Sequence, residues 1–151
     1  MRFLIQRVNS ASVLVDGEAT GSIEKGLLVF IGICESDDEA IADKLLDKLL
    51  KLRIFDDADG KTNLSVFDVS GELLLVSQFT LYANCKKGNR PSFTDAAGPE
   101  KANGLYEYII KEAEKKIRVG TGIFGADMKV TLENDGPFTV MLDSDEICPA
   151  K

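Results

Sequence analysis

The chain has 151 residues, of which 44% are hydrophobic and 28% charged, and this composition and length indicate a single globular domain over residues 1–151 with one substantial core. It contains no histidine, which excludes Ser-His and Cys-His catalytic pairs, histidine-ligated metals and imidazole acid–base steps. The formal net charge of −7 argues against a protein that coats DNA or RNA indiscriminately, because phosphate contacts require Lys and Arg.

Strands are predicted where apolar residues alternate or run together between turn-forming residues. In chain order, these segments are residues 3–8, 10–16, 18–23, 26–34, 63–69, 72–83, 126–133 and 138–144. Asp16-Gly17 predicts a tight hairpin between the second and third segments. The continuous apolar run of the fourth predicts a strand covered on both faces.

Two helices are predicted between these strands. The first spans residues 36–53, where Ser36 and Glu39 match a capping box and apolar residues fall along one stripe. The second begins near Pro99, a favoured first-turn residue. With no repeat and no linker, these runs predict an α+β domain with a largely antiparallel, barrel-like sheet and two main helices.

Cysteine usage and the N-terminal residues bear on location. Cys34, Cys85 and Cys148 lack the short spacings of a zinc site and the density of a disulfide scaffold. Polar residues interrupt the first apolar stretch before it reaches the length of an export signal. We therefore expect a cytoplasmic protein with no metal, no cofactor and no membrane association.

The segment SQFTL, residues 77–81, places Ser77, Gln78 and Thr80 in what begins as a buried strand. An unpartnered buried hydroxyl or amide costs about 1 to 3 kcal/mol, so a core strand does not accumulate such groups. Alternate side chains of a strand face opposite ways, and a bend near Phe79 would be needed to bring these groups together. The pattern fits either strand-end caps or a site.

The segment ENDGPFTV, residues 133–140, is rich in turn formers and predicts a hairpin between the last two strands. Gly136 precedes Pro137, and the bond before a proline is the one peptide bond that is cis with appreciable frequency. A cis bond here would hold two neighbouring carbonyls in a fixed arrangement.

The two segments together resemble the D-aminoacyl-tRNA deacylase family. Ser-Gln-x-Thr and Gly-Pro-x-Thr are specific as a pair, and three further segments fit the same family. These are IQRV with ASV near the start, NRPSF at residues 89–93 and FGADMKV at residues 124–130. The resemblance runs from Met1 to about Asp143.

The resemblance implies hydrolysis of the ester between a D-amino acid and the 3′-terminal ribose of tRNA, and also of glycyl-tRNA mischarged on tRNA-Ala. It implies a homodimer without metal or cofactor. The catalytic segment would be Ser77, Gln78, Phe79 and Thr80. Backbone N–H groups at this strand end would hold the oxyanion, which is usually a large electrostatic contribution to such catalysis.

The resemblance also implies how chirality is selected. Gly136 and Pro137, joined by a cis bond, would enter the active site of the partner subunit, with Arg7 and Met128 as further substrate-binding or selecting residues. Rigid carbonyls beside the substrate Cα would leave room for a hydrogen but not for an L side chain.

Three cations in the polar segment NCKKGNRPSF are candidates for phosphate contacts with tRNA, since an acidic protein must still accept it. They are Lys86, Lys87 and Arg90. Cys85 lies beside them, but without histidine nothing obvious lowers its pKa, so we expect a bystander thiol. Two other interpretations stay open: a non-catalytic module that binds the tRNA 3′ end, and a dimerisation domain without a ligand.

Overall fold

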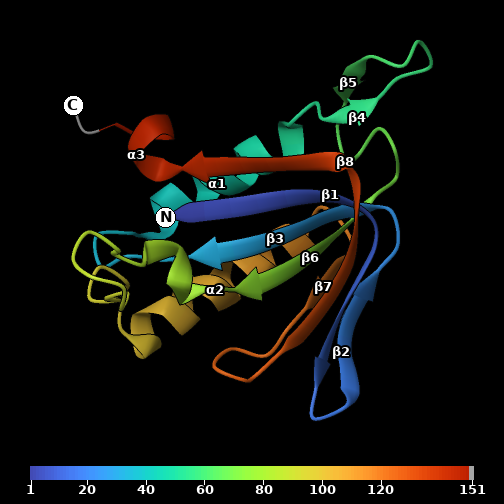
Figure 1. Ribbon diagram of the computed structural model, residues 1–151. Coiled ribbons are helices and arrows are strands. Elements are labelled where there is room, and N and C mark those ends of the chain that lie inside the picture. The colour runs from blue at the N-terminus through green and yellow to red at the C-terminus, as the bar shows by residue number, and fades with distance from the viewer. Residues whose placement is uncertain (150–151) are drawn as a thin grey trace.

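The computed structural model describes residues 1–149, which form a curved sheet with helices packed on one face (Figure 1). The strands are β1 (Arg2–Val15), β2 (Glu18–Ile23), β3 (Gly26–Gly32), β4 (Phe55–Asp56), β5 (Thr62–Leu64), β6 (Glu72–Ser77), β7 (Val119–Thr121) and β8 (Lys129–Asp143). The helices are α1 (Glu39–Lys51), α2 (Pro99–Glu114), the short α3 (Ser144–Ile147) and the 3₁₀ turn η1 (Phe79–Tyr82).

The main sheet has the strand order β2-β1-β3-β6-β7, with β8 also paired to β1. At its open side, the Thr20 hydroxyl of β2 donates to the Thr121 carbonyl of β7 at 3.4 Å, so the sheet is nearly barrel-shaped. The three pairings made by β1 are antiparallel, but β3–β6 and β6–β7 are parallel. The sheet is therefore mixed, and the prediction of a largely antiparallel sheet is only partly right.

The parallel pairings follow from where the helices stand in the chain. Parallel neighbours need a crossover of a dozen or more residues, and α1 lies between β3 and β6 while α2 lies between β6 and β7. The expected coverage of β3 is confirmed, because five of its seven residues are apolar and its neighbours cover both faces.

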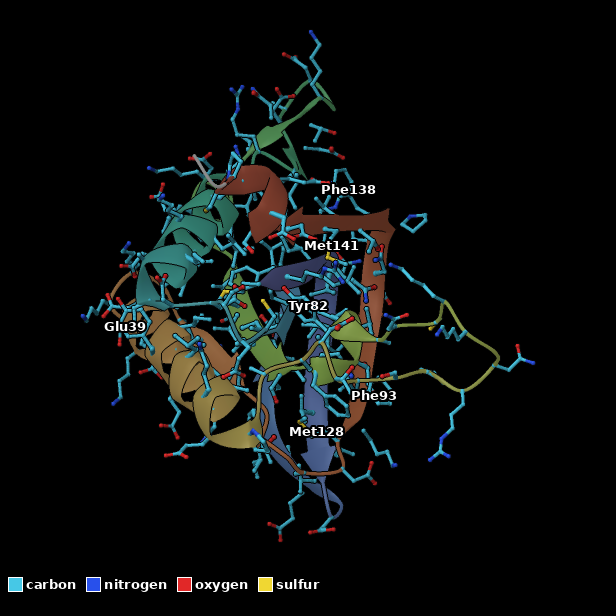
Figure 2. The ribbon with its side chains drawn as sticks, turned by 90° about the vertical axis from the view of Figure 1, so that its left-hand side faces the viewer. Glu39, Tyr82, Phe93, Met128, Phe138 and Met141 are labelled. Carbon is cyan, nitrogen blue, oxygen red and sulfur yellow. The ribbon has the colours of Figure 1, made fainter. Side chains whose placement is uncertain are left out.

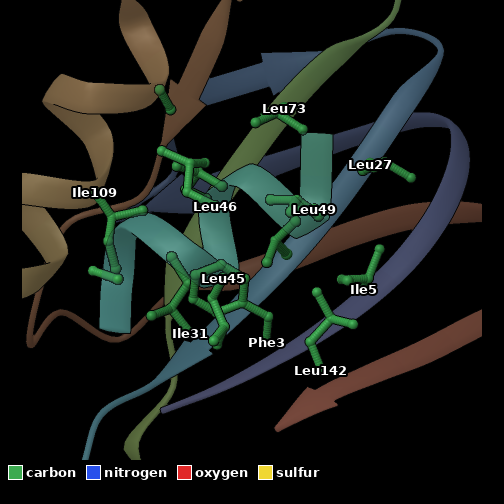
Figure 3. Packing of buried hydrophobic residues seen from close by; sticks show 14 of the residues in the cluster. Phe3, Ile5, Leu27, Ile31, Leu45, Leu46, Leu49, Leu73, Ile109 and Leu142 are labelled. Carbon is green, nitrogen blue, oxygen red and sulfur yellow. The ribbon is translucent and has the colours of Figure 1, made fainter. Parts of the chain in front are cut away.

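The larger core cluster fills the space between the helices and the sheet (Figure 3). Leu45 and Leu49 of α1 face Phe3 and Leu27, all fully buried. Each such leucine contributes about 2 kcal/mol through the apolar area that it removes from water. A second cluster, on the other face, contains Val8, Val13, Leu28, Leu74 and Val76, among others.

The two long helices occur where they were predicted, with one correction at the start of α1, whereas the short α3 and η1 were not predicted. Its N-cap is Asp38, whose carboxylate accepts the Ile41 N–H at 2.9 Å; Ser36 lies outside the helix and contacts the Cys34 sulfur instead. Pro99 is the first residue of α2. No helix in residues 1–149 is both long and apolar enough to cross a membrane.

The strand predictions are corrected in several places. The two strands predicted at residues 3–8 and 10–16 are one strand, β1, and the strand predicted at residues 72–83 ends at Ser77. Only residues 63–64 of the predicted 63–69 region lie in a strand, β5, because the Asp68 carboxylate accepts the Ser65 N–H at 2.8 Å and fixes a turn there. The short β7 was not predicted. The two strands predicted at residues 126–133 and 138–144 are replaced by one element, β8, which spans Lys129–Asp143 and whose two flanks both pair with β1 around a bulge.

Candidate active site

The polar residues after β6 lie where the strand ends. β6 stops at Ser77, and the Gln78 N–H makes a last sheet bond of 2.8 Å to the Ile31 carbonyl. The chain then turns into η1, whose first N–H groups, those of Phe79 and Thr80, have no acceptor within residues 1–149. The strand end thus presents two adjacent backbone donors.

A cavity of about 560 Å³ opens beside this strand end. Four of the residues predicted to form the site line it: Ser77, Gln78, Phe79 and Met128. The remaining lining residues are Val76, Phe93, Ala96, Ala97, Pro99, Ala102, Phe124, Gly125, Ala126 and Val130. None of the fourteen is charged, so the described chain supplies no Asp, Glu, Lys or Arg at the cavity wall.

Aromatic side chains form one rim of the cavity. The Phe79 and Phe93 rings meet edge to face with centroids 5.1 Å apart, and their side chains remain 56% and 39% exposed. Met128 also lines the cavity, and its sulfur lies 2.5 Å from the position that a Cβ on Gly122 would occupy, so the glycine leaves room for this side chain. Figure 2 shows Phe93 and Met128 on the same side of the molecule.

Thr80 does not line the cavity, although the three residues before it do. Its hydroxyl oxygen accepts a hydrogen bond from the Gln78 side-chain amide, and Thr80 itself is exposed. The side chain is therefore engaged by Gln78, while its backbone N–H is free at the start of η1.

Gly136 and Pro137 lie in the bulge of β8, exposed and outside the cavity of their own chain. The peptide bond between them is cis, and Gly136 has a φ of +149°, which favours glycine. A Cβ at Gly136 would lie 2.7 Å from the Phe138 nitrogen. In Figure 2, Phe138 and Met141 lie well away from Met128, on another part of the surface.

Arg7 holds the loop around Gly136 and Pro137 in place. Arg7 is only 6% exposed. Its guanidinium donates hydrogen bonds to the Asp135 carbonyl at 2.9 Å and to the Ile54 carbonyl at 2.8 Å. The guanidinium also lies 4.7 Å from the centre of the Phe138 ring. One cation thereby ties the β8 bulge to the segment that precedes β4.

Asn134 is a second clamp that the sequence reasoning missed. Its side-chain oxygen accepts the Phe138 N–H at 2.6 Å, and its amide nitrogen lies within 3.2 Å of acceptors on Gln6, Phe138 and Thr139. The signal was available, since Asn side chains commonly bond backbone groups a few residues on.

The three predicted tRNA-contacting cations, Lys86, Lys87 and Arg90, lie on an exposed loop. Its base is closed by paired backbone hydrogen bonds of 2.7 and 2.9 Å between Asn84 and Ser92. In Figure 2 the loop, drawn in yellow-green, projects away from the body of the protein. Cys85 lies on this loop and outside the first cavity.

Comparison with known proteins shows extensive similarity over nearly the whole chain. A family model described as D-Tyr-tRNA(Tyr) deacylase matches residues 4–143. A protein of Thermosipho melanesiensis named D-aminoacyl-tRNA deacylase is 55% identical over 149 residues, covering 97% of this chain and 99% of its own. A protein of the same name from Lactobacillus acidophilus is 57% identical over 144 residues, covering 95% and 99%.

Solved structures are also similar. One named c-Myc DNA Unwinding Element Binding Protein has a TM-score of 0.89 at 40% identity and covers 95% of this chain and 98% of its own. A probable eukaryotic D-amino acid tRNA deacylase has the same fold, with a TM-score of 0.74 at 19% identity over 93% and 97% of the two chains. From the family match and the identities, this chain belongs to the D-Tyr-tRNA(Tyr) deacylase family.

Proposed function

We propose that this protein hydrolyses the ester bond of D-aminoacyl-tRNA in the cytoplasm, releasing the D-amino acid and tRNA. The observation that carries the proposal is the pair of unengaged backbone N–H groups of Phe79 and Thr80 at the strand end beside the cavity. Attack of water on an ester carbonyl places negative charge on its oxygen. Preorganised N–H donors in a largely apolar site are suited to stabilise that charge.

The attacking water is activated by the substrate. A threonine hydroxyl is a weak nucleophile without a base, and the described cavity wall carries no ionisable side chain. The ribose hydroxyl vicinal to the ester is held within reach once tRNA binds, so it orients the water and helps to take its proton. Thr80 accordingly positions the substrate, while its N–H helps to hold the oxyanion.

Selection against L substrates is made across a homodimer. The exposed position of Gly136 and Pro137, outside their own cavity, fits a loop that enters the site of a second subunit. The exposed Phe79 and Met141 side chains provide apolar surface that such a dimer would cover. Glycine has no side chain to exclude, so the same selection admits glycyl-tRNA, including that mischarged on tRNA-Ala.

The competing functions are a module that binds the tRNA 3′ end without turnover and a dimerisation domain without a ligand. To separate them, purified protein is incubated with a D-aminoacyl-tRNA and with its L counterpart, and ester loss is followed over time. Cys85→Ser is assayed in parallel, because a thiol outside the cavity beside Ser77 is not expected to act as the nucleophile.

Loss of only the D ester, retained in Cys85→Ser, is the expected result. Binding of both tRNAs without ester loss would favour the binding module and overturn the proposal. Hydrolysis of both stereoisomers at equal rates would refute the selection by Gly136 and Pro137.

A further inference from the structure

A second cavity, of about 400 Å³, lies at the other end of η1. Phe79 at the start of η1 lines the first cavity, and Tyr82 at its end lines the second. The second cavity draws Arg2 from β1, Asp95 from the segment before α2, and Lys86 from the exposed loop. The two cavities thus lie at opposite ends of a single short turn.

The chemistry of the second cavity differs from that of the first. The Arg2 guanidinium lies 4.5 Å from the centre of the Tyr82 ring and is held by the Asp143 carboxylate at 2.9 Å and the Leu81 carbonyl at 2.8 Å. Guanidinium and aromatic planes are the surfaces on which unpaired bases stack. Arg2 and Tyr82 therefore make one fixed, planar wall.

Acceptors and a cation complete the cavity. Within residues 1–149 the Asp95 carboxylate accepts one long hydrogen bond, 3.4 Å from the Asn84 amide, and Asp95 is exposed. The Asn84 side-chain oxygen accepts the Lys86 N–H at 3.1 Å, which sets the start of the exposed loop. The Lys86 ammonium has no acceptor or ion pair in residues 1–149.

We propose that this cavity binds the nucleotide that precedes the ester-bearing adenosine and reads it as cytidine; the proposal rests on the proposed function for the placement of that adenosine. The Asp95 carboxylate accepts from the exocyclic amino group of cytosine, the pairing that carboxylates make with this base. Lys86 neutralises the phosphate that joins the two nucleosides. Transfer RNAs end in C-C-A, so a cytidine always occupies this position in the substrate.

Comparing uracil with cytosine tests the proposal sharply, because uracil presents a carbonyl oxygen where cytosine presents the amino group. A carboxylate repels that oxygen. One hydrogen bond to a charged acceptor then gives about a tenfold preference for cytidine. Asp95→Asn removes the preference, since an amide can accept from the amino group and can also donate to the carbonyl.

The test measures binding of the dinucleotides CpA and UpA by NMR titration of the intact protein, in wild type, Asp95→Asn and the control Asp59→Asn. Asp59 is an exposed carboxylate in the β4–β5 hairpin and lines neither cavity, so its substitution makes the same charge change elsewhere. We expect wild type and the control to prefer CpA over UpA by about tenfold. We expect this preference to fall below about twofold in Asp95→Asn. Equal binding of the two dinucleotides by wild type, or a preference that persists in Asp95→Asn, overturns the proposal.

Hydrolysis of a D-aminoacyl-tRNA is measured on the same preparations to keep the two proposals separate. A cytidine preference without hydrolysis leaves the cavity assignment standing and refutes the proposed function. Hydrolysis without a cytidine preference does the reverse.

Discussion

The strand end at Ser77–Tyr82 and the loop around Gly136 are held by different means. The strand end is fixed by main-chain pairing with β3, and two backbone N–H groups without an acceptor in residues 1–149 lie there, beside the cavity. The loop is fixed by side chains, chiefly those of Arg7 and Asn134. Side-chain substitutions should therefore disturb the loop, and the selection assigned to it, more than the oxyanion donors of the strand end.

The largest effect is expected for Arg7→Ala. It removes hydrogen bonds to two carbonyls and frees the β8 bulge, and a misplacement of about 1 Å near a reacting centre can cost about 100-fold. We expect the ratio of D to L hydrolysis to fall by about that factor, measured as kcat/KM for the two stereoisomers. Arg53→Ala is the matched control, because Arg53 bonds only to Asn63 in residues 1–149. An unchanged ratio in Arg7→Ala would mean that the loop does not depend on this cation.

Asn134→Ala should have a smaller effect of the same kind. The Phe138 N–H loses its acceptor, which lowers the free energy of unfolding by about 1 to 3 kcal/mol. Chemical denaturation measures that loss, and the D to L ratio should fall with it. Asn9→Ala is a suitable comparison, since Asn9 makes one exposed bond to Glu133. If both variants lose the same free energy of unfolding, Asn134 does not hold the loop in place.

Substituting the cations of the exposed loop tests their contribution to tRNA affinity rather than to selectivity. If Lys86 and Lys87 contact phosphates, the log of tRNA affinity falls with the log of salt by about 0.7 for each contact on a single strand. The double variant Lys86→Ala, Lys87→Ala should flatten this slope by about 1.4. Removing Lys111, in the last turn of α2, and Lys116, just after that helix, both exposed, provides the charge-matched control. The same slope in wild type and in the loop variant would place the tRNA-binding surface elsewhere.

The smallest effect is expected behind the strand end, at Tyr106. Its buried hydroxyl donates to the Leu75 carbonyl of β6 at 2.7 Å, and burial raises the pKa of Tyr106 to about 12, so it remains a donor at any physiological pH. Tyr106→Phe should cost about 1 kcal/mol of unfolding free energy, with turnover nearly intact because main-chain pairing still holds β6. A large loss of turnover at this modest cost in stability would show that side chains also position the donors.

How much was predictable depends on the range of the interactions involved. The two long helices, the hairpin at Asp16-Gly17 and the family were evident from local patterns. The register of β8 was not, because NDGP has the composition of a hairpin turn, and only pairing of both flanks with β1 makes it a bulge. The three-residue β7 is too short to show a period.

The site followed the same division. Ser77, Gln78, Phe79 and Met128 were predicted and line one cavity, but the catalytic roles of the first three and the substrate-binding role of Met128 remain predictions. The contact of Arg7 with the Ile54 carbonyl joins residues 47 positions apart, and the second cavity joins β1 to residues near the middle of the chain. No local sequence pattern reports such contacts.

The central claim is that backbone N–H donors and the substrate's own ribose hydroxyl carry out the hydrolysis. Its most direct test compares the loss of hydrolysis rate caused by two separate changes. Hydrolysis of a D-aminoacyl-tRNA is measured with Thr80→Ala, and wild-type hydrolysis is measured with a tRNA whose terminal ribose lacks the free hydroxyl vicinal to the ester. General acid–base assistance is worth about 100-fold or more, so the deoxy substrate should lose at least that factor, while Thr80→Ala should retain turnover within about tenfold. Abolished turnover in Thr80→Ala with tRNA binding intact, or an acyl-enzyme trapped at Thr80, would contradict the account and make threonine the nucleophile.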